Sequence, residues 1–205
     1  VVPDIMMVAK SIGGGVFPNA ALIYRNIPVL TNFVNKNPFF HVSSGGGTDI
    51  GCRVSSKVID YLVENRVWEN AERAGKRFKE GLNQITDENP RIVKEVRGQG
   101  LMIGVEYQYE FIGALMADCL AREGVWAVFS GNAPQVMRFQ IPVTVTMEEV
   151  EDLLVRIRKA VRRMKPYLVI FFPMARIPFI RMMLDNMHVQ IKAFNFLRDI
   201  EELFS

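Results

Sequence analysis

Hydrophobic and polar residues follow two different periods along the chain, and the period changes from segment to segment. Short apolar runs predict strands at residues 4–9, 20–24, 93–96, 100–107, 125–129 and 136–141. Apolar residues spaced by three and four predict helices at residues 27–34, 50–85 with breaks, 112–123 and 146–164. Thr146 opens the last helix with a start that resembles a capping box, although the acid comes one position early. This mixture of strands and helices predicts an α/β fold.

A turn cluster at residues 87–90, Asp-Glu-Asn-Pro, divides the pattern and predicts a domain boundary. We expect one domain over residues 1–88, a small α+β domain over residues 89–164, and an apolar helical extension over residues 165–205. The extension is rich in Phe, Met and Pro, and its arginines among large apolar residues also fit a membrane-surface anchor. Its last helix ends on acids, so no basic face is sustained, which favours an extension packed on protein over an anchor.

Lys10 follows the first apolar run directly and precedes a glycine cluster at residues 13–15. Lysine is rarely buried, so a lysine between two buried strands is paired, exposed at a strand end or used covalently. In a dry pocket its amine becomes a nucleophile that forms a Schiff base with an aldehyde. A Walker phosphate loop does not fit, because there the lysine follows the glycines. The residues alone leave a surface lysine and a reactive lysine open.

Composition and charge exclude several classes of protein. Hydrophobic residues make up 49% of the chain, which is enough for a sizeable core, and a dispersed net charge of +3 argues against nucleic acid. The isolated residues Cys52, Cys119, His41 and His188 fit neither a disulfide framework nor a metal site. No signal peptide or bilayer-spanning run is present, which predicts a cytoplasmic protein. The chain starts VVPDIMM, inside a strand pattern and without an initiator methionine, so we expect it to be a piece of a longer protein.

Two further segments carry chemistry. Ser43, Ser44, three glycines and Thr48 lead into the start of a helix, where free backbone N–H groups and the helix dipole favour an anion such as phosphate. Arg138 lies among apolar residues of a predicted strand, where its guanidinium fits either a substrate carboxylate or a structural ion pair. A reactive amine together with a phosphate cradle is what a pyridoxal phosphate (PLP) enzyme requires.

Four motifs in order resemble the C-terminal half of class III (omega-type) aminotransferases, which are fold type I PLP enzymes. PDIMMVAKSIGGGVFPNAA is similar to the lysine segment of that family, and HVSSGGGTDIGC to its histidine–serine–threonine–glycine segment. VRGQGLMIGVEY resembles the strand that opens the small domain, and VMRFQIPVTVTMEEVEDLL the segment with the carboxylate-binding arginine. The resemblance covers residues 1 to about 164, and the extension lies outside it.

The resemblance implies the second part of a fold type I large domain, then a small C-terminal α+β domain and a helical tail. It implies PLP as cofactor and transamination between a small-molecule amino donor and a keto acid or aldehyde acceptor, in a homodimer. Lys10 would be the catalytic Schiff-base lysine, and Ser43 and Ser44 would contact the cofactor phosphate, Ser44 reaching across to the neighbouring subunit. Arg138 would bind the substrate carboxylate.

The chain also departs from the family pattern. Ser44 replaces a threonine, and the loop after it carries an extra glycine and lacks the usual Asn-Pro. The acid for the pyridine nitrogen, the aromatic ring stacker and the glycine-rich phosphate loop of the family would all precede residue 1, so the isolated chain can be inactive. Two alternatives stay open: an aminomutase or decarboxylase of the same fold, and an inactive fragment that acts only as a binding module.

Overall fold

The structure is a computed structural model, which describes residues 2–40, 46–178, 182, 184 and 186. The chain forms two compact units, residues 1–67 and 68–205, and each is described by itself.

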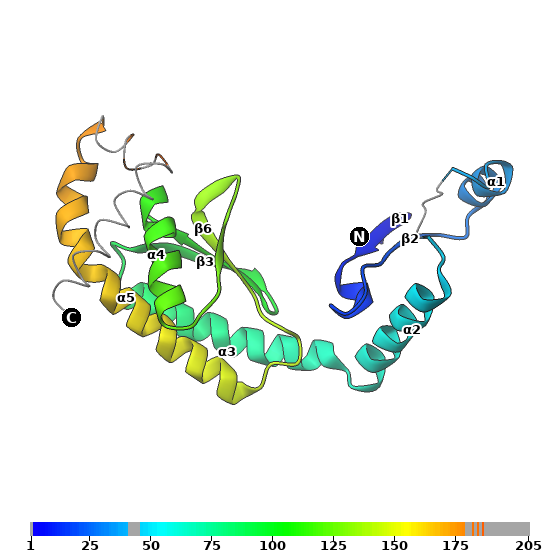
Figure 1. The fold of residues 1–205 in the computed structure, drawn as a ribbon, viewed down its shortest axis with the longest axis horizontal. Coiled ribbons are helices and arrows are strands. Elements are labelled where there is room, and N and C mark those ends of the chain that lie inside the picture. The colour runs from blue at the N-terminus through cyan, green and yellow to red at the C-terminus, as the bar shows by residue number, and fades with distance from the viewer. Residues whose placement is uncertain (1, 41–45, 179–181, 183, 185, 187–205) are drawn as a thin grey trace. The chain divides into compact units, whose positions relative to one another are not determined.

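The first unit begins with an antiparallel hairpin (Figure 1). Strand β1 (Ile5–Ala9) pairs with strand β2 (Ala20–Tyr24), and the short 3-10 helix η1 (Ser11–Gly13) lies in the connection. Helix α1 (Pro28–Lys36) follows, with a proline in its first turn, where a missing N–H costs nothing. The predicted strands at 4–9 and 20–24 are confirmed to within one residue.

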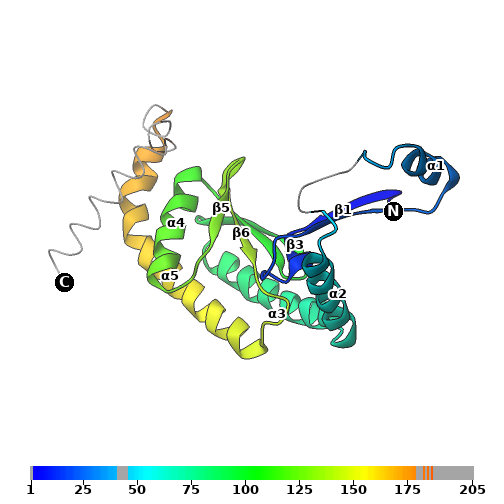
Figure 2. The same cartoon turned by 45° about the vertical axis from the view of Figure 1, so that its right-hand side comes forward.

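Helix α2 (Asp49–Glu64) starts after Thr48, as its capping residues predict, and η1 packs against it (Figure 2). The predicted break in the long helical pattern falls at Arg66, whose positive φ of 44° ends one helix before helix α3 (Val67–Glu88) begins.

The hairpin strands are more exposed than their apolar sequence predicts. Ile5 is 53% and Met7 81% exposed, so the expectation that Lys10 lies between two buried strands is wrong for this chain. Within the described part of the first unit the sheet has only these two strands, and a two-stranded hairpin has too little area to bury both of its faces.

The second unit is built on a four-stranded antiparallel sheet in the order β3-β4-β6-β5. Its strands are β3 (Val93–Gln99), β4 (Met102–Tyr107), β5 (Val128–Ser130) and β6 (Ala133–Gln140). Ile103 and Val105 on β4, with Met137 and Phe139 on β6, are buried, whereas the residues that alternate with them are exposed or half-buried. One face of the sheet is therefore packed and the other is open.

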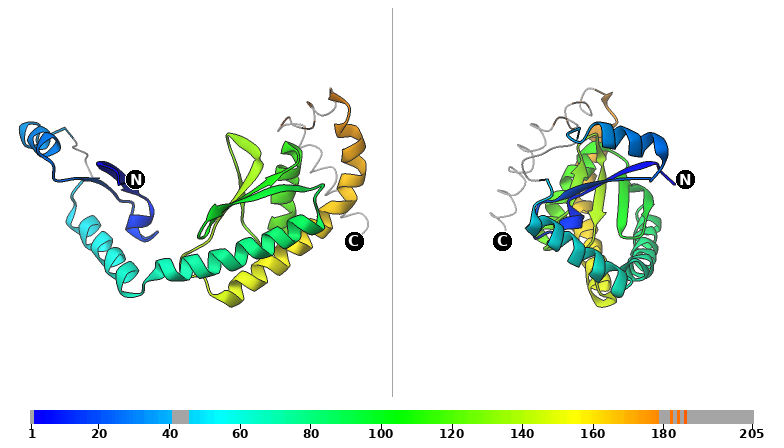
Figure 3. Two further views of the ribbon diagram at one scale, coloured as in Figure 1. Left: turned by 180° about the vertical axis from the view of Figure 1, so that it is seen from behind. Right: turned by 90° about the vertical axis from the view of Figure 1, so that its right-hand side faces the viewer.

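Three helices cover the packed face: α3, α4 (Glu110–Arg122) and α5 (Met147–Ala175). Helices α3 and α5 run side by side (Figure 3), joined by ion pairs between Arg77 and Glu151 and between Arg158 and Glu88. The core contains Phe78 of α3, whose ring meets that of Phe139 edge-on at 5.5 Å.

The structure does not divide the chain at the two domain boundaries that the sequence predicts, after residues 88 and 164. Helix α3 contributes Ala74, Phe78, Leu82 and Ile85 to the second core, so the structure divides the chain before this helix rather than after residue 88. Helix α5 continues past residue 164 to Ala175, so no break marks the start of the predicted extension. The extension from residue 187 onward lies outside the described residues, and its role stays a prediction.

The start of α5 corrects one detail of the sequence interpretation. Thr146 and Glu149 form a complete capping box, with the Glu149 N–H donating to Thr146 Oγ1 at 3.2 Å and the Thr146 N–H donating to Glu149 Oε2 at 2.8 Å. The acid is therefore at its regular place, three residues after the cap. Among the helices of the described residues, none combines the length and apolar character that crossing a bilayer requires.

Candidate active site

Lys10 lies at the end of β1, in a turn with an unusual backbone. Its φ is 58° and its ψ is −85°, a conformation that residues with a Cβ rarely adopt. Such a residue costs on the order of 1–3 kcal/mol and persists only where its surroundings impose it. The Lys10 N–H donates to the Asn19 carbonyl at 3.1 Å, and the Lys10 carbonyl accepts the Gly13 N–H at 3.0 Å. The turn is therefore fixed from both sides of Lys10.

The Lys10 side chain is exposed, and it forms no ion pair or hydrogen bond with the residues that the structure describes. This leaves no structural ion pair of Lys10 among the described residues, and both a surface lysine and a covalently used lysine stay open.

The predicted phosphate loop is described only in part. Ser43 and Ser44 lie outside the described residues, so their contact with a phosphate stays a prediction. After them, Gly47 has a positive φ of 69°, and Thr48 caps α2 without a hydrogen bond from its side chain. Among the described residues, no side chain therefore caps the first-turn N–H groups of this 16-residue helix, which suits an anion at that end.

Arg138 lies in the middle of β6 on the open face of the second unit's sheet. Its register neighbours are Gly104 on β4 and Val128 on β5. Gly104 has no side chain, so one flank of Arg138 is bare backbone. The Arg138 guanidinium has no ion pair with any described residue, and it is exposed. The structural ion pair that the sequence left open is therefore not found there, and the guanidinium is available to a carboxylate.

A second arginine on the same face is already paired with acidic side chains. Arg97 on β3 pairs with Gly104 from the other side, and its guanidinium contacts Glu95 at 2.9 Å as well as Glu106. Glu106 also accepts from Lys94 at 2.6 Å. The hydrogen bonds from Lys94 and then Arg97 hold the pKa of the Glu106 carboxyl below its ordinary value. Of the two arginines beside Gly104, only Arg138 is left for an outside anion.

The structure adds residues that sequence reasoning did not single out. Asn19 connects the Lys10 turn to α2 through hydrogen bonds to Gly51 and Ser55, which are 32 and 36 residues away in the chain. Glu106 and its two basic partners were missed as well. No local signal marks these residues, because their partners lie on other elements.

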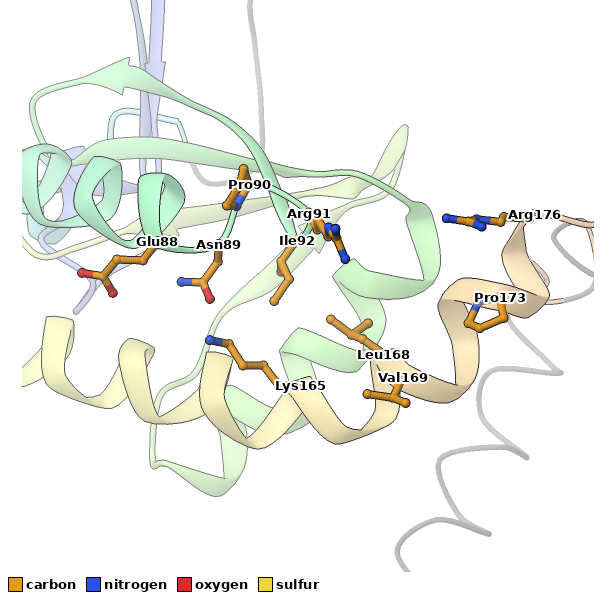
Figure 4. Close-up of a pocket in the computed structure, with 10 residues that line it drawn as sticks. All are labelled: Glu88, Asn89, Pro90, Arg91, Ile92, Lys165, Leu168, Val169, Pro173 and Arg176. Atoms are coloured by element: carbon orange, nitrogen blue, oxygen red, sulfur yellow. The ribbon is translucent and has the colours of Figure 1, made fainter.

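A cavity of about 540 Å³ lies between the end of α3 and the second half of α5 (Figure 4). Its walls include the apolar residues Ile92 and Leu168 and the charged residues Arg91 and Lys165. Its one buried polar residue, Asn89, donates its amide to the Ile85 carbonyl at 2.8 Å and is thereby satisfied. The cavity contains none of the predicted site residues.

Lys10 belongs to the first unit and Arg138 to the second, so the structure describes their surroundings separately. The roles of both residues stay predictions.

Comparison with known proteins places these residues in a family. The family model for class-III aminotransferases matches residues 1–161. An uncharacterized aminotransferase of Archaeoglobus fulgidus is 36% identical over 151 residues, which cover 74% of this chain and 35% of that protein.

Solved structures agree. An ornithine aminotransferase from Toxoplasma gondii, in which PLP partially occupies the active site, is 31% identical with a TM-score of 0.69 and covers 77% of this chain and 36% of its own. The N-acetylornithine aminotransferase of Stenotrophomonas maltophilia is 29% identical with a TM-score of 0.67 and covers 82% of this chain and 42% of its own. The chain thus spans little more than a third of the length of the first relatives. Since the family model covers most of its residues, the chain belongs to the class-III aminotransferase family.

Proposed function

We propose that the chain forms part of a PLP-dependent transaminase in which Lys10 is the residue that attaches the cofactor. The observation that carries this proposal is the turn at Lys10, where an exposed amine stands on a backbone held at a φ of 58°. Membership of the class-III aminotransferase family supports the same residue, because the lysine segment falls inside the matched range.

The donor groups of the chain fit PLP by their chemistry. The cofactor aldehyde requires a free amine, which Lys10 offers, and its phosphate requires N–H and hydroxyl donors, which Ser43, Ser44 and the uncapped start of α2 offer. Bound PLP supplies an electron sink for the bond that is broken at the amino donor.

Lys10 would have a second task as a proton carrier. Its amine would accept the proton from the α-carbon of the amino donor and deliver it to the C4′ carbon of PLP, as base and then as acid. A fixed backbone at Lys10 favours this role, because it limits the positions of the amine, which must reach two atoms in succession.

Arg138 would orient the substrate by its carboxylate. Its guanidinium forms no ion pair with the described residues, its fork geometry matches two carboxylate oxygens, and the neighbouring Arg97 is paired with Glu95 and Glu106. A keto acid or an amino acid would then bind with its carboxylate on the open face of the sheet, and an aldehyde acceptor would lack this contact.

The exposed apolar side chains of the β1–β2 hairpin support the proposal that further protein covers this hairpin. Ile5, Met7 and Ile23 are 53%, 81% and 47% exposed, and apolar strands of this kind are ordinarily covered. Further parts of a longer chain and a second subunit are the proposed cover, and the homodimer belongs to this proposal.

Other reactions at the same lysine are less well supported. An aminomutase or decarboxylase would use Lys10 in the same way, but the relatives reported above are all named aminotransferases. A module without catalysis would not need an unpaired amine on a strained turn.

Covalent trapping tests the role of Lys10. The protein is incubated with PLP and reduced with borohydride, and labelled peptides are identified by mass spectrometry. We expect label on Lys10, its loss in Lys10→Ala and its retention in Lys36→Ala, a control at an exposed lysine of the same unit. Equal labelling of Lys36 and Lys10 would overturn the assignment.

Amino-group exchange tests the reaction itself. Turnover of an amino donor by the PLP-loaded protein should require a keto acid or aldehyde, and Arg138→Lys should raise KM for carboxylate substrates about tenfold or more, since a bidentate contact becomes a point charge. Turnover that is independent of any acceptor would point to the aminomutase or decarboxylase instead.

A further inference from the structure

Asn19 joins the backbone turn that carries Lys10 to helix α2. Its carbonyl accepts the Lys10 N–H at 3.1 Å, directly beyond the last pair of the β1–β2 ladder. Its side-chain nitrogen Nδ2 donates to the Gly51 carbonyl at 3.0 Å and to the Ser55 hydroxyl at 2.7 Å. One residue thereby links the Lys10 turn with two successive turns of a 16-residue helix.

The partners of Asn19 set the direction of its amide. The Gly51 carbonyl only accepts hydrogen bonds, so the atom that faces it is the donating nitrogen. Ser55 is 8% exposed, one of the few buried polar residues among those described, and its hydroxyl oxygen takes the other amide hydrogen. A carboxylate of the same shape has no hydrogen to donate, so it would lose the bond to the Gly51 carbonyl and could only accept from the Ser55 hydroxyl.

Helix α2 presents a face that admits this contact. Gly51, Ser55 and Val58 are spaced by four and three residues, so they lie on one side of the helix. A Cβ at Gly51 would lie 3.3 Å from Phe17 Cε1, beside Asn19 Nδ2 at 3.4 Å, and a Cβ at Gly14 in the turn would lie 2.9 Å from Val58 Cγ2. The turn and the helix therefore approach closely where both lack side chains.

We propose that Asn19 is a positioning residue for Lys10, which fixes the strained turn by anchoring it to α2; this rests on the proposed function, in which Lys10 attaches the cofactor. A residue at a φ of 58° returns to an ordinary backbone conformation unless its neighbours prevent it. Such a return would turn the Cα–Cβ bond of Lys10, and its amine would then start from a different direction. Asn19 acts through the backbone alone and touches no reacting atom.

Hydrogen exchange tests the anchor without any cofactor. Asn19→Asp keeps the shape of the side chain but places a carboxylate oxygen against the Gly51 carbonyl, which breaks that bond, and Asn19→Ala removes both side-chain bonds. We expect the Lys10 and Gly13 amides of the 205-residue chain to exchange about tenfold faster in both variants, because local opening becomes easier. Asn37→Asp is the matched control, since Asn37 Nδ2 donates to the Phe33 carbonyl at 2.8 Å within its own helix and does not contact the turn.

Kinetics of the PLP-loaded protein test positioning against a general loss of structure. In Asn19→Asp, kcat should fall about tenfold or more, while KM for the amino donor and the bound PLP stay within about threefold of the starting protein. Parallel losses in kcat, KM and PLP content would indicate a merely structural role and overturn the proposal.

The two hypotheses fail separately. Unchanged exchange at Lys10 in a folded Asn19→Asp protein refutes the anchor, even if Lys10 carries the cofactor. Absence of PLP label on Lys10 in the starting protein refutes the proposed function, and the exchange result still decides the anchor. Where both Asn19 variants fail to fold, Ser55→Ala removes one of the two side-chain bonds, and an exchange rate at Lys10 equal to that of the starting protein then refutes the proposal.

Discussion

The strain at Lys10 gives a prediction with a definite sign: Lys10→Gly should stabilise the hairpin, and Lys10→Ala should not. Glycine adopts a φ of 58° freely, so it relieves a strain of about 1–3 kcal/mol. It loses about 0.5–1 kcal/mol through the greater freedom of the unfolded chain. The central values of these two ranges leave a net gain over Lys10→Ala of about 1 kcal/mol. Alanine keeps its Cβ and with it the strain, so it gives no such gain.

Local hydrogen exchange is the suitable assay, because the two units can unfold separately and a global transition would mix them. Amides of β1 and β2 in Lys10→Gly should exchange about fivefold more slowly than in Lys10→Ala, which is the same free energy expressed as a rate ratio. Amides of α3 belong to the core of the second unit, so their exchange rates should not change. A matched pair at Lys36, in the last turn of α1, should show the opposite order, with glycine less stable than alanine by about 0.5–1 kcal/mol.

The result that refutes this reasoning is a Lys10→Gly protein no more stable than Lys10→Ala. It would mean that the positive φ at Lys10 carries no strain and that a side chain is tolerated there without help. The interpretation of the turn as an imposed conformation would then be wrong, whatever the chemistry of the amine.

Three further perturbations follow from the second unit. Glu106→Gln should lower the unfolding free energy by about 1 kcal/mol at neutral pH. The pKa of Glu106 is lowered in the folded protein, so this carboxylate stabilises the fold above its ordinary pKa of 4.5 and loses that effect as acid protonates it. Urea unfolding curves of the two proteins should therefore converge at low pH. In Gly113→Ala the new Cβ would meet the Pro134 carbonyl oxygen at 2.1 Å, so this substitution should cost about 2–4 kcal/mol in thermal unfolding. Gly131→Ala is the control and should be nearly neutral, because Gly131 has open space around it. Equal melting temperatures of the two variants would refute the close packing of α4 on β6. Thr146→Ala breaks the capping box and should cost about 1 kcal/mol in the same assay, and no change would show that the cap does not hold α5.

The sequence predicted most elements of the fold because their signals are local. Alternation and apolar runs placed β1 and β2 within one residue, and capping residues placed the start of α2 at Thr48. The ends of helices were less predictable. Pro166 did not end α5, because Leu168 beyond it is buried in the second core and helical packing outweighs the missing N–H.

The sequence by itself also determined the family and its candidate residues, since Lys10 and Arg138 stand in ordered motifs that need no partner to be recognised. Only the tertiary structure decided that α3 belongs to the second core, that Arg97 is neutralised while Arg138 is not, and that Asn19 anchors the Lys10 turn to α2. These facts depend on residues brought together from distant parts of the chain. Packing and hydrogen bonds across 32 or 36 positions leave no periodic trace, so they exist only once the chain has folded.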